Sequence, residues 1–245
     1  MAEPRTVGAG QGAAWWGEGW RLFTPAVGVW LLIWVILVGL YLVAAFTVVG
    51  SLVMDVLLPV FAGGLMLGCR ALDRGNPLTL GHLFAGFSQR TRPLVVVGLI
   101  YTALSILIML LVAGMMVALF GVAIFGMLIG AVDPSQTGIA LDSAVVAVLL
   151  GVLFILLLLV PLVMAVWFAP ALVMLGGLSA AAAMTASFRG CVRNIVPFLL
   201  YSLIGLGLAI VASIPFGLGW FVLLPVMTTS IYASYCDIFE DQGPA

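Results

Sequence analysis

Long apolar runs, separated by short polar stretches, follow one another along most of this chain. A run of about 18 or more apolar residues is long enough to cross the hydrocarbon core of a membrane as a helix. Six runs meet this length, at 27–49, 52–72, 94–117, 143–168, 197–214 and 220–238. They are continuously apolar, whereas the strands of membrane β-barrels alternate between apolar and polar residues. The pattern therefore predicts an all-α, polytopic membrane protein with six transmembrane helices.

Three amphipathic segments precede the first, third and fifth of these runs. They lie at the end of residues 1–23, at 77–90 and at 179–193. In the first segment Trp16, Trp20 and Phe23 share one face, with Glu18 and Arg21 on the other. Such a pattern is typical of helices that lie in the plane of the membrane interface. We therefore predict three interfacial amphipathic helices.

Small and polar residues indicate where the first hairpin turns and where helices pack closely. The connection between the first two spans is placed at Gly50–Ser51, which puts Asp55 in the first turn of the second span. Gly64 and Gly68 form a GxxxG pair within that span. This spacing favours close packing between membrane helices.

The region between the third and fourth spans departs from the regular spacing. The uncharged run from Pro93 to Val132 would, as one helix, be about twice as long as the hydrocarbon core is thick. We therefore end the third span near Val117 and expect 118–131 to be an interfacial or re-entrant piece. Residues 133–138 predict a turn, and Asp142 or Ser143 is expected to cap the fourth span.

Spacings that recur along the chain indicate three repeated units. A glycine precedes an aromatic residue by twelve positions three times, in the pairs Gly8–Trp20, Gly75–Phe87 and Gly176–Phe188. The second span of each unit contains a proline, at Pro59, Pro161 and Pro225. These anchors predict three helix–hairpin units at about 8–74, 75–175 and 176–241 within one membrane domain of residues 1–245. Chance similarity between low-complexity apolar stretches is the alternative.

The distribution of charge predicts the orientation of the spans. All eight basic residues are arginines, and in a six-span arrangement they fall on one side of the membrane. The other side carries no basic residue and three acidic ones, Asp55, Asp133 and Asp142. Because basic loops stay in the cytoplasm, we expect cytoplasmic N- and C-termini in a bacterial inner (plasma) membrane.

Composition and motifs remove several classes of function. Charged residues make up 7% of the chain, against about 25% in soluble domains. The net charge of −1 does not indicate a basic surface of the kind that binds nucleic acid. No ionisable residue lies near the middle of a span, which argues against an ion-coupled carrier. Motifs for nucleotide binding, zinc proteolysis and serine hydrolysis are missing, so we expect no catalytic residue, cofactor or metal.

The single histidine and the three cysteines offer weak signals. His82 could act as a catalytic base or pH sensor, but an interfacial side chain resting among headgroups is the favoured interpretation. The cysteines, Cys69, Cys191 and Cys236, follow no metal-binding spacing and are interpreted as free thiols. A metal shared among them is the alternative.

Five arginines are candidates for binding lipid headgroups: Arg21, Arg90, Arg92, Arg189 and Arg193. They lie within or just beyond the amphipathic segments, where lipid phosphates are expected. The guanidinium fork suits a phosphate, and anionic lipids attract basic residues. Arg189 and Arg193 follow Thr185 at i+4 and i+8 and share its strip. The alternative is that the arginines only determine orientation during insertion.

Residues 61–87 and 167–206, which include the segment SFRGCVRN (187–194), resemble a known group. It is a family of uncharacterised six-helix bacterial inner-membrane proteins, distantly similar to the membrane domain ahead of some glycerophosphodiester phosphodiesterases. The likeness runs from Trp15 to Phe239 and is weakest at 118–142. It implies an integral plasma-membrane protein of unknown activity, without catalytic residues of its own.

These observations favour a non-enzymatic membrane module that binds anionic lipid headgroups or a protein partner at the cytoplasmic face. A channel or permease for a small or apolar solute is the alternative, since internal repeats are common among membrane transporters. An enzyme that acts on lipid comes third, because the acid–base residues that it needs are missing.

Overall fold

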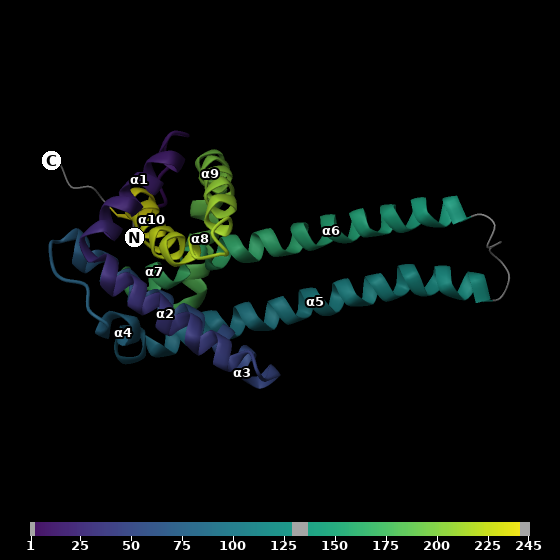
Figure 1. Cartoon of the computed structure of the whole chain (residues 1–245), viewed down its shortest axis with the longest axis horizontal. Helices are drawn as coiled ribbons and strands as arrows, with labels where there is room; N and C mark the ends of the chain where they lie inside the picture. The colour runs from purple at the N-terminus through teal and green to yellow at the C-terminus, as the bar shows by residue number, and fades with distance from the viewer. Residues whose placement is uncertain (1–2, 129–136, 241–245) are drawn as a thin grey trace. The chain divides into compact units, whose positions relative to one another are not determined.

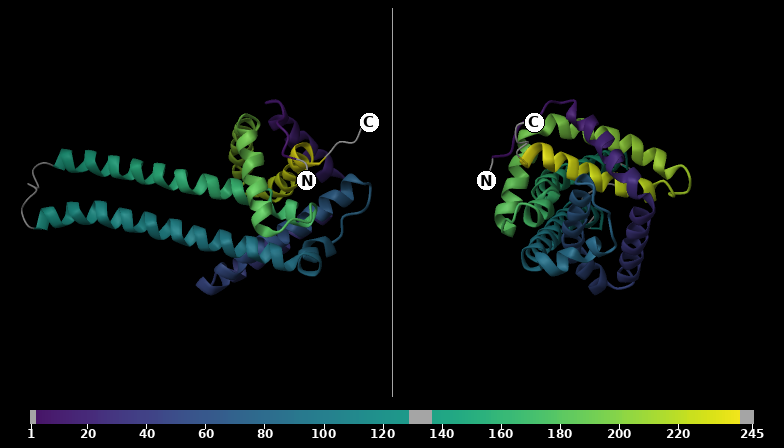
Figure 2. Two further views of the ribbon diagram at one scale, coloured as in Figure 1. Left: turned by 180° about the vertical axis from the view of Figure 1, so that it is seen from behind. Right: turned by 90° about the vertical axis from the view of Figure 1, so that its left-hand side faces the viewer.

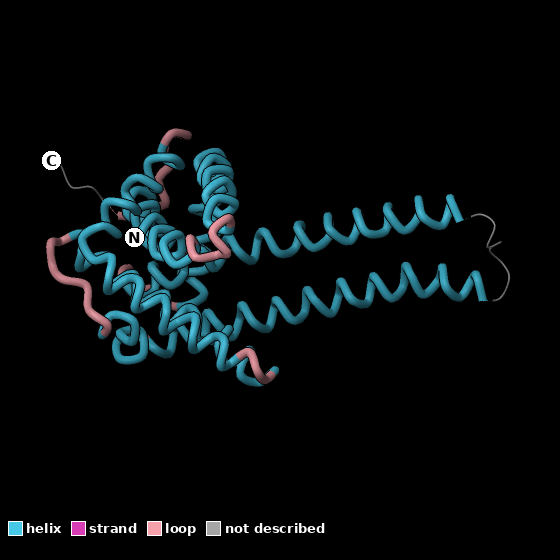
Figure 3. Tube along the Cα trace, in the orientation of Figure 1, coloured by secondary structure: helices cyan, strands magenta, loops and turns pink. Residues whose placement is uncertain are grey.

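The computed structural model describes residues 3–128 and 137–240, and the side chains within 3–118, 145–146 and 148–240. Throughout these ranges the chain forms helices and connecting turns, without a β-strand (Figure 3). The elements are α1 (Gln11–Phe23), η1 (Thr24–Ala26), α2 (Val27–Ala44), α3 (Val48–Asp73), α4 (Gly81–Gln89), α5 (Thr91–Leu128), α6 (Thr137–Trp167), α7 (Ala169–Met174), α8 (Ala180–Arg193), α9 (Ile195–Ser213) and α10 (Trp220–Phe239).

Six helical stretches among the described residues are long and apolar enough to cross a membrane. They are Gln11–Ala44, Val48–Asp73, Thr91–Ala118, Val148–Met174, Ile195–Ser213 and Trp220–Phe239. The predicted all-α, multi-pass membrane architecture is therefore confirmed. Short helices occur at the three amphipathic segments, as α1, α4 and α8. Their placement in the membrane interface stays a prediction.

Contacts divide the chain into two units. Unit 1 comprises Met1–Ile100 and Met164–Ala245, and unit 2 comprises Tyr101–Val163. Within unit 2 the stretches of α5 and α6 run antiparallel (Figure 1), and Met116 of α5 lies against Gly151 of α6. Most of the described apolar side chains of this pair are exposed, as is typical of surfaces that face lipid. The single membrane domain over 1–245 stays a prediction.

Contacts between short and long helices organise unit 1. α1 packs along α10 and α9, α4 packs along α3, and α8 packs on α7 (Figure 1 and Figure 2). α3 and α10 also contact each other and α2. In both of these helices 56% of the most apolar stretch is buried, against 17% in α9. α3 and α10 are therefore the central helices of unit 1.

Glycines permit the closest of these contacts. Gly19 of α1 faces α10, where an added Cβ would lie 2.8 Å from the carbonyl oxygen of Val226. On α4, a Cβ at Gly86 would collide with the carbonyl oxygen of Val60 in α3. Small residues allow the backbones of membrane helices to approach one another. At these two positions the helices meet backbone to backbone.

The GxxxG pair of α3 forms a close-packing face, as predicted, but its partner is a short helix instead of another span. A Cβ at Gly64 would collide with the carbonyl oxygen of His82 in α4. At Gly68 it would lie 2.6 Å from the side chain of Leu78, just before α4. The sequence indicated close packing but carries no information about which helix approaches.

The first hairpin turns earlier than predicted. α2 ends at Ala44 and α3 begins at Val48, so the connection at Gly50–Ser51 was wrong. Thr47 caps α3, because its side-chain oxygen accepts a hydrogen bond of 2.9 Å from the Gly50 N–H. Threonine is a favoured N-cap residue. Asp55 consequently lies beyond the first turn of α3, contrary to the prediction.

The long uncharged region also differs from the prediction. α5 continues as one helix to Leu128, so the helix break expected near Val117 was wrong. The apolar span within it ends at Ala118, and the placement of 118–128 in the membrane stays a prediction. Glycines inside a helix cost only about 1 kcal/mol each, which does not end it. α6 begins at Thr137, so neither Asp142 nor Ser143 caps it. Residues 133–136 of the expected turn lie outside the described residues.

We predict that Gly86→Ala destabilises the contact between α4 and α3. The added Cβ would meet the backbone of Val60, and overpacking of this kind costs about 1–3 kcal/mol. Thermal unfolding in detergent should therefore begin at a lower temperature than for the parent protein. Gly17→Ala in α1 is the matched control, because nothing lies within 4 Å of a Cβ at that position. Equal midpoints for the two variants would contradict the close approach.

Candidate functional site

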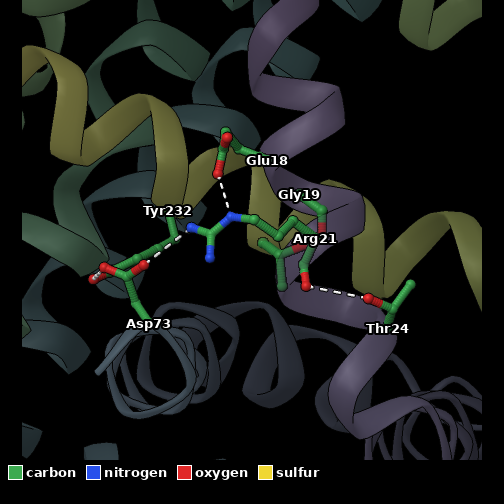
Figure 4. Close-up of polar contacts among 7 residues, drawn as sticks. Glu18, Gly19, Arg21, Thr24, Asp73 and Tyr232 are labelled. Carbon is green, nitrogen blue, oxygen red and sulfur yellow. Dashed lines mark hydrogen bonds and ion pairs between the residues drawn. The ribbon is translucent and has the colours of Figure 1, made fainter. Parts of the chain in front are cut away.

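Polar side chains from α1, α3 and α10 meet at one point of unit 1 (Figure 4). Arg21 Nε lies 2.6 Å from Glu18 Oε2, and Arg21 Nη2 lies 3.2 Å from Asp73 Oδ1. The hydroxyl of Tyr232 donates a hydrogen bond of 3.3 Å to Asp73 Oδ2. Because the Arg21 side chain is 59% exposed, each ion pair contributes about 0–1 kcal/mol. These contacts orient Arg21 more than they stabilise the fold.

A second group of polar contacts joins the end of α10 to α1 and α3. The indole N–H of Trp15 donates to Asp237 Oδ2 at 2.8 Å. Arg70 Nη2 lies 2.6 Å from Glu240 Oε1. Trp15 and Asp237 line a cavity of about 360 Å³ that also includes Asp73 and Tyr232. Across the described residues, no group of histidines, cysteines and carboxylates is arranged to hold a metal ion.

The buried side chain of Asn194 binds the N-terminal segment to the end of α8. Its Oδ1 accepts a hydrogen bond of 2.9 Å from the Val7 N–H. Its Nδ2 donates to the carbonyl oxygens of Arg5 and Gly190, both at 2.9 Å. The Arg5 N–H donates in turn to the Ile238 carbonyl of α10 at 2.9 Å. The segment is therefore held between the ends of α8 and α10.

A groove of about 740 Å³ runs along α8 and is closed on one side by Glu3 and Pro4. Its α8 wall carries Ala181, Ala182, Thr185, Ala186, Phe188, Arg189, Val192 and Arg193. The strip of Thr185, Arg189 and Arg193 predicted from the sequence thus lines one groove, beside apolar side chains. An amphipathic groove of this kind can accept a charged group and the hydrocarbon attached to it. We define it as the α8 groove.

The five candidate arginines have different surroundings. Arg21 is paired with two carboxylates, and both terminal nitrogens of Arg193 lie 3.3 Å from Glu3 Oε2. Arg90 lies against the loop between α7 and α8, near Gly177. Arg92 and Arg189 are exposed and have no ion pair or side-chain hydrogen bond among the described residues. Only Arg189 and Arg193 line one groove together.

The cysteines and His82 show no catalytic arrangement among the described residues. Cys69 and Cys191 are buried, and Cys236 is half-buried. Burial raises the pKa of the Cys191 thiol to about 12, so it is a poor nucleophile near neutral pH. His82 Nδ1 accepts a hydrogen bond of 3.1 Å from the Thr79 N–H at the start of α4. The histidine therefore supports a local turn.

Sequence reasoning did not identify the partners of these arginines or the role of Asn194. The pairing of Arg21 with Asp73 joins residues 52 positions apart, and nothing in a single sequence predicts such a distance. For Asn194 a signal existed, because the polar residue ends the SFRGCVRN segment directly before an apolar run. A buried side-chain amide needs several hydrogen-bond partners, and this requirement points to a fastening role.

We predict that Asn194→Ala releases the N-terminal segment. The variant loses three hydrogen bonds of a buried side chain, each of which contributes about 1 kcal/mol net. Amide hydrogen exchange at residues 3–10, measured by mass spectrometry, should accelerate while exchange in α3 stays unchanged. The control is Asn76→Ala, since Asn76 is exposed between α3 and α4. If both variants exchange like the parent, Asn194 does not fasten the segment.

Comparison of the chain with protein-family models, with curated proteins and with solved structures finds no match. The resemblance noted at residues 61–87 and 167–206 stays an expectation. The function of this multi-pass membrane protein is therefore argued from its geometry.

Proposed function

We propose that this protein is a non-enzymatic module of the bacterial inner membrane that binds anionic lipid headgroups in the α8 groove. The observation that carries the proposal is the pair Arg189 and Arg193 on one wall of that groove. Phe188 and Val192 stand beside them, 38% and 43% exposed. A phosphate would meet the guanidinium groups while the glycerol and upper acyl carbons meet the apolar side chains.

Arg189 is the principal contact in this proposal. It is exposed and has no ion-pair partner among the described residues, so binding a phosphate breaks no existing bond. A basic group beside an anionic leaflet contributes about 1 kcal/mol, and less at high salt. A guanidinium can also bind two phosphate oxygens at once. Arg21, Arg90 and Arg92 would add weaker, less specific attraction at the same membrane face.

Arg193 has a different role, because it is already engaged. Its guanidinium lies beside the Glu3 carboxylate and donates to the Pro4 carbonyl at 3.0 Å. A lipid phosphate would have to share or displace the Glu3 carboxylate, which is 83% exposed. Arg193 therefore shapes the groove. Arg189 supplies the guanidinium group that has no ion-pair partner among the described residues.

Exposed aromatic residues support the placement of the short helices in the interface. Trp20 of α1, Phe87 of α4 and Phe188 of α8 are 52%, 38% and 38% exposed. Aromatic side chains are enriched at the boundary between hydrocarbon and headgroups. The opposite faces of the same helices pack on α10, α3 and α7. In this proposal each short helix has one face on the protein and one towards the lipid.

The same contacts support three repeated units. Gly19, Gly86 and Ser187 each directly precede one of these aromatic residues and are buried. Gly19 faces Val226 and Gly86 faces Val60, the residues that follow Pro225 and Pro59. In the predicted repeat 176–241 the Ser187 hydroxyl donates a hydrogen bond of 2.7 Å to the carbonyl oxygen of Met164, which lies three residues beyond Pro161.

The pairing between units would be cyclic. α4, in the predicted repeat 75–175, packs on α3 of the repeat 8–74. α8, in the repeat 176–241, packs on α7 at the end of the repeat 75–175. α1 of the repeat 8–74 packs on α10 of the repeat 176–241. Each short helix would then lie against the end of the preceding repeat, with the last repeat preceding the first around the cycle. A channel or permease built around such a cycle stays the alternative function.

We predict that Arg189→Gln lowers the retention of anionic lipid. The loss of one basic contact worth about 1 kcal/mol corresponds to roughly a fivefold drop in affinity. Phosphatidylglycerol or cardiolipin that remains bound after purification can be counted by native mass spectrometry. Arg74→Gln is the matched control, because Arg74 is exposed, lies outside the candidate set and changes the net charge equally.

Equal lipid retention in Arg189→Gln and Arg74→Gln would leave membrane insertion as the role of Arg189. Solute flux through proteoliposomes that contain the parent protein tests the alternative. Flux above that of empty vesicles would favour the channel or permease over a binding module.

Orientation is a separate part of the proposal. Arginines occur in the N-terminal stretch and in the loops that follow the second and fourth spans, so these regions should be cytoplasmic. Reporter fusions after Asn76, Asn194 and Ala245 should therefore be cytoplasmic, and a fusion after Gly138 periplasmic. A cytoplasmic reporter after Gly138 would overturn the proposed arrangement of spans.

A further inference from the structure

An apolar pocket of about 290 Å³ lies within unit 1, between α2, α3, α7, α10 and the last residue of α6. The walls are formed mainly by aromatic and aliphatic side chains, among them Trp34, Leu37, Phe61, Ala62, Trp167 and Ile231. Its volume is close to the lower end of the range for small-molecule sites, about 300–1,000 Å³. The pocket is distinct from the α8 groove, with which it shares no lining residue.

Water is a poor occupant of this pocket. Apart from the indole nitrogens, Tyr41 and Thr228 are the only polar side chains among the described residues that line it. The Thr228 hydroxyl already donates to the Leu224 carbonyl at 2.9 Å. The indole nitrogens of Trp34 and Trp167 are buried in the walls without a hydrogen-bond partner among the described residues. An ordered water needs about three partners, which these walls do not offer.

The level of the pocket along the helices indicates what surrounds its mouth. The lining residues of α3 run from Met54 to Met66, in the middle of the span Val48–Asp73. Leu42, Leu58 and Tyr41 line the pocket and are 60%, 41% and 43% exposed. At this level a span is surrounded by acyl chains. The medium at the mouth is therefore hydrocarbon.

We propose that this pocket binds one acyl chain of a bilayer lipid. Apolar walls, the lack of partners for water and a mouth at the level of hydrocarbon all favour that occupant. A partner helix, about 10 Å across with its side chains, does not fit the volume. The proposal does not depend on the arginines of the α8 groove, so the headgroup can be zwitterionic.

Photocrosslinking in vesicles tests the proposal. The full-length protein is reconstituted in phosphatidylcholine that carries a diazirine on one acyl chain, and the adducts are mapped by mass spectrometry. Adducts are expected on buried pocket residues such as Met54 and Met66, in addition to residues on the lipid-facing surface such as Met109 of α5, which is 69% exposed. Adducts confined to the lipid-facing surface would overturn the proposal.

A variant that fills the pocket provides the second arm. Ala62→Phe places a ring in the pocket and should lower the pocket adducts roughly tenfold, the effect of losing about 1.4 kcal/mol of binding. Ala103→Phe is the matched control, because Ala103 is exposed on α5. If Ala62→Phe does not fold, Ala62→Leu replaces it. An undiminished pocket yield in the filled variant would exclude an acyl chain inside the pocket.

Arg189→Gln separates this proposal from the proposed function. Phosphatidylcholine has no net charge, so its pocket adducts should be unchanged in that variant. Absence of pocket adducts in the parent protein, together with lower anionic-lipid retention in Arg189→Gln than in the parent, would contradict the acyl-chain site alone. Pocket adducts in the parent, together with equal anionic-lipid retention in the parent and Arg189→Gln, would contradict the headgroup site alone.

Discussion

In a bilayer the acyl chains are as apolar as the side chains, so helices gain little from the hydrophobic effect when they associate. Close contact between backbones becomes the main attraction, and it requires residues without bulky side chains. Gly19 on α1 and Gly86 on α4 provide this contact with α10 and α3. Because α3 and α10 are the central helices of unit 1, these two contacts join α1 and α4 to the centre of that unit.

The sequence was informative where one physical property dominates. Hydropathy alone located all six spans, and the ends of α10 at Trp220 and Phe239 lie within a residue of the predicted range. Boundaries were less predictable, because the cap at Thr47 depends on a single hydrogen bond to Gly50. In α5 the helix break expected near Val117 was wrong, because the helix continues to Leu128. The prediction rested on the thickness of the hydrocarbon core, which does not limit the length of a helix.

The candidate sites were predictable only in part. The strip of Thr185, Arg189 and Arg193 follows from helical periodicity, and these residues do line one groove. The second wall of that groove comes from Glu3 and Pro4, and Glu3 is 190 positions from Arg193 in the sequence. The apolar pocket between α2, α3, α7, α10 and the last residue of α6 was invisible in the sequence, because its residues look like those of any membrane span. Cavities depend on how helices fail to fill space, which periodicity does not encode.

The contact between α1 and α10 has a consequence for biogenesis. α1 leaves the ribosome before α10, which is synthesised about 200 residues later, from Trp220 onwards. At about 5–20 residues per second, α1 waits for roughly 10–40 s without its partner. During that interval its apolar face, with Trp15 and Trp16, needs another apolar environment, and the membrane surface is the nearest one. In the proposed interfacial placement of α1, the bilayer covers this face until α10 has been inserted and the contact between the two helices can form.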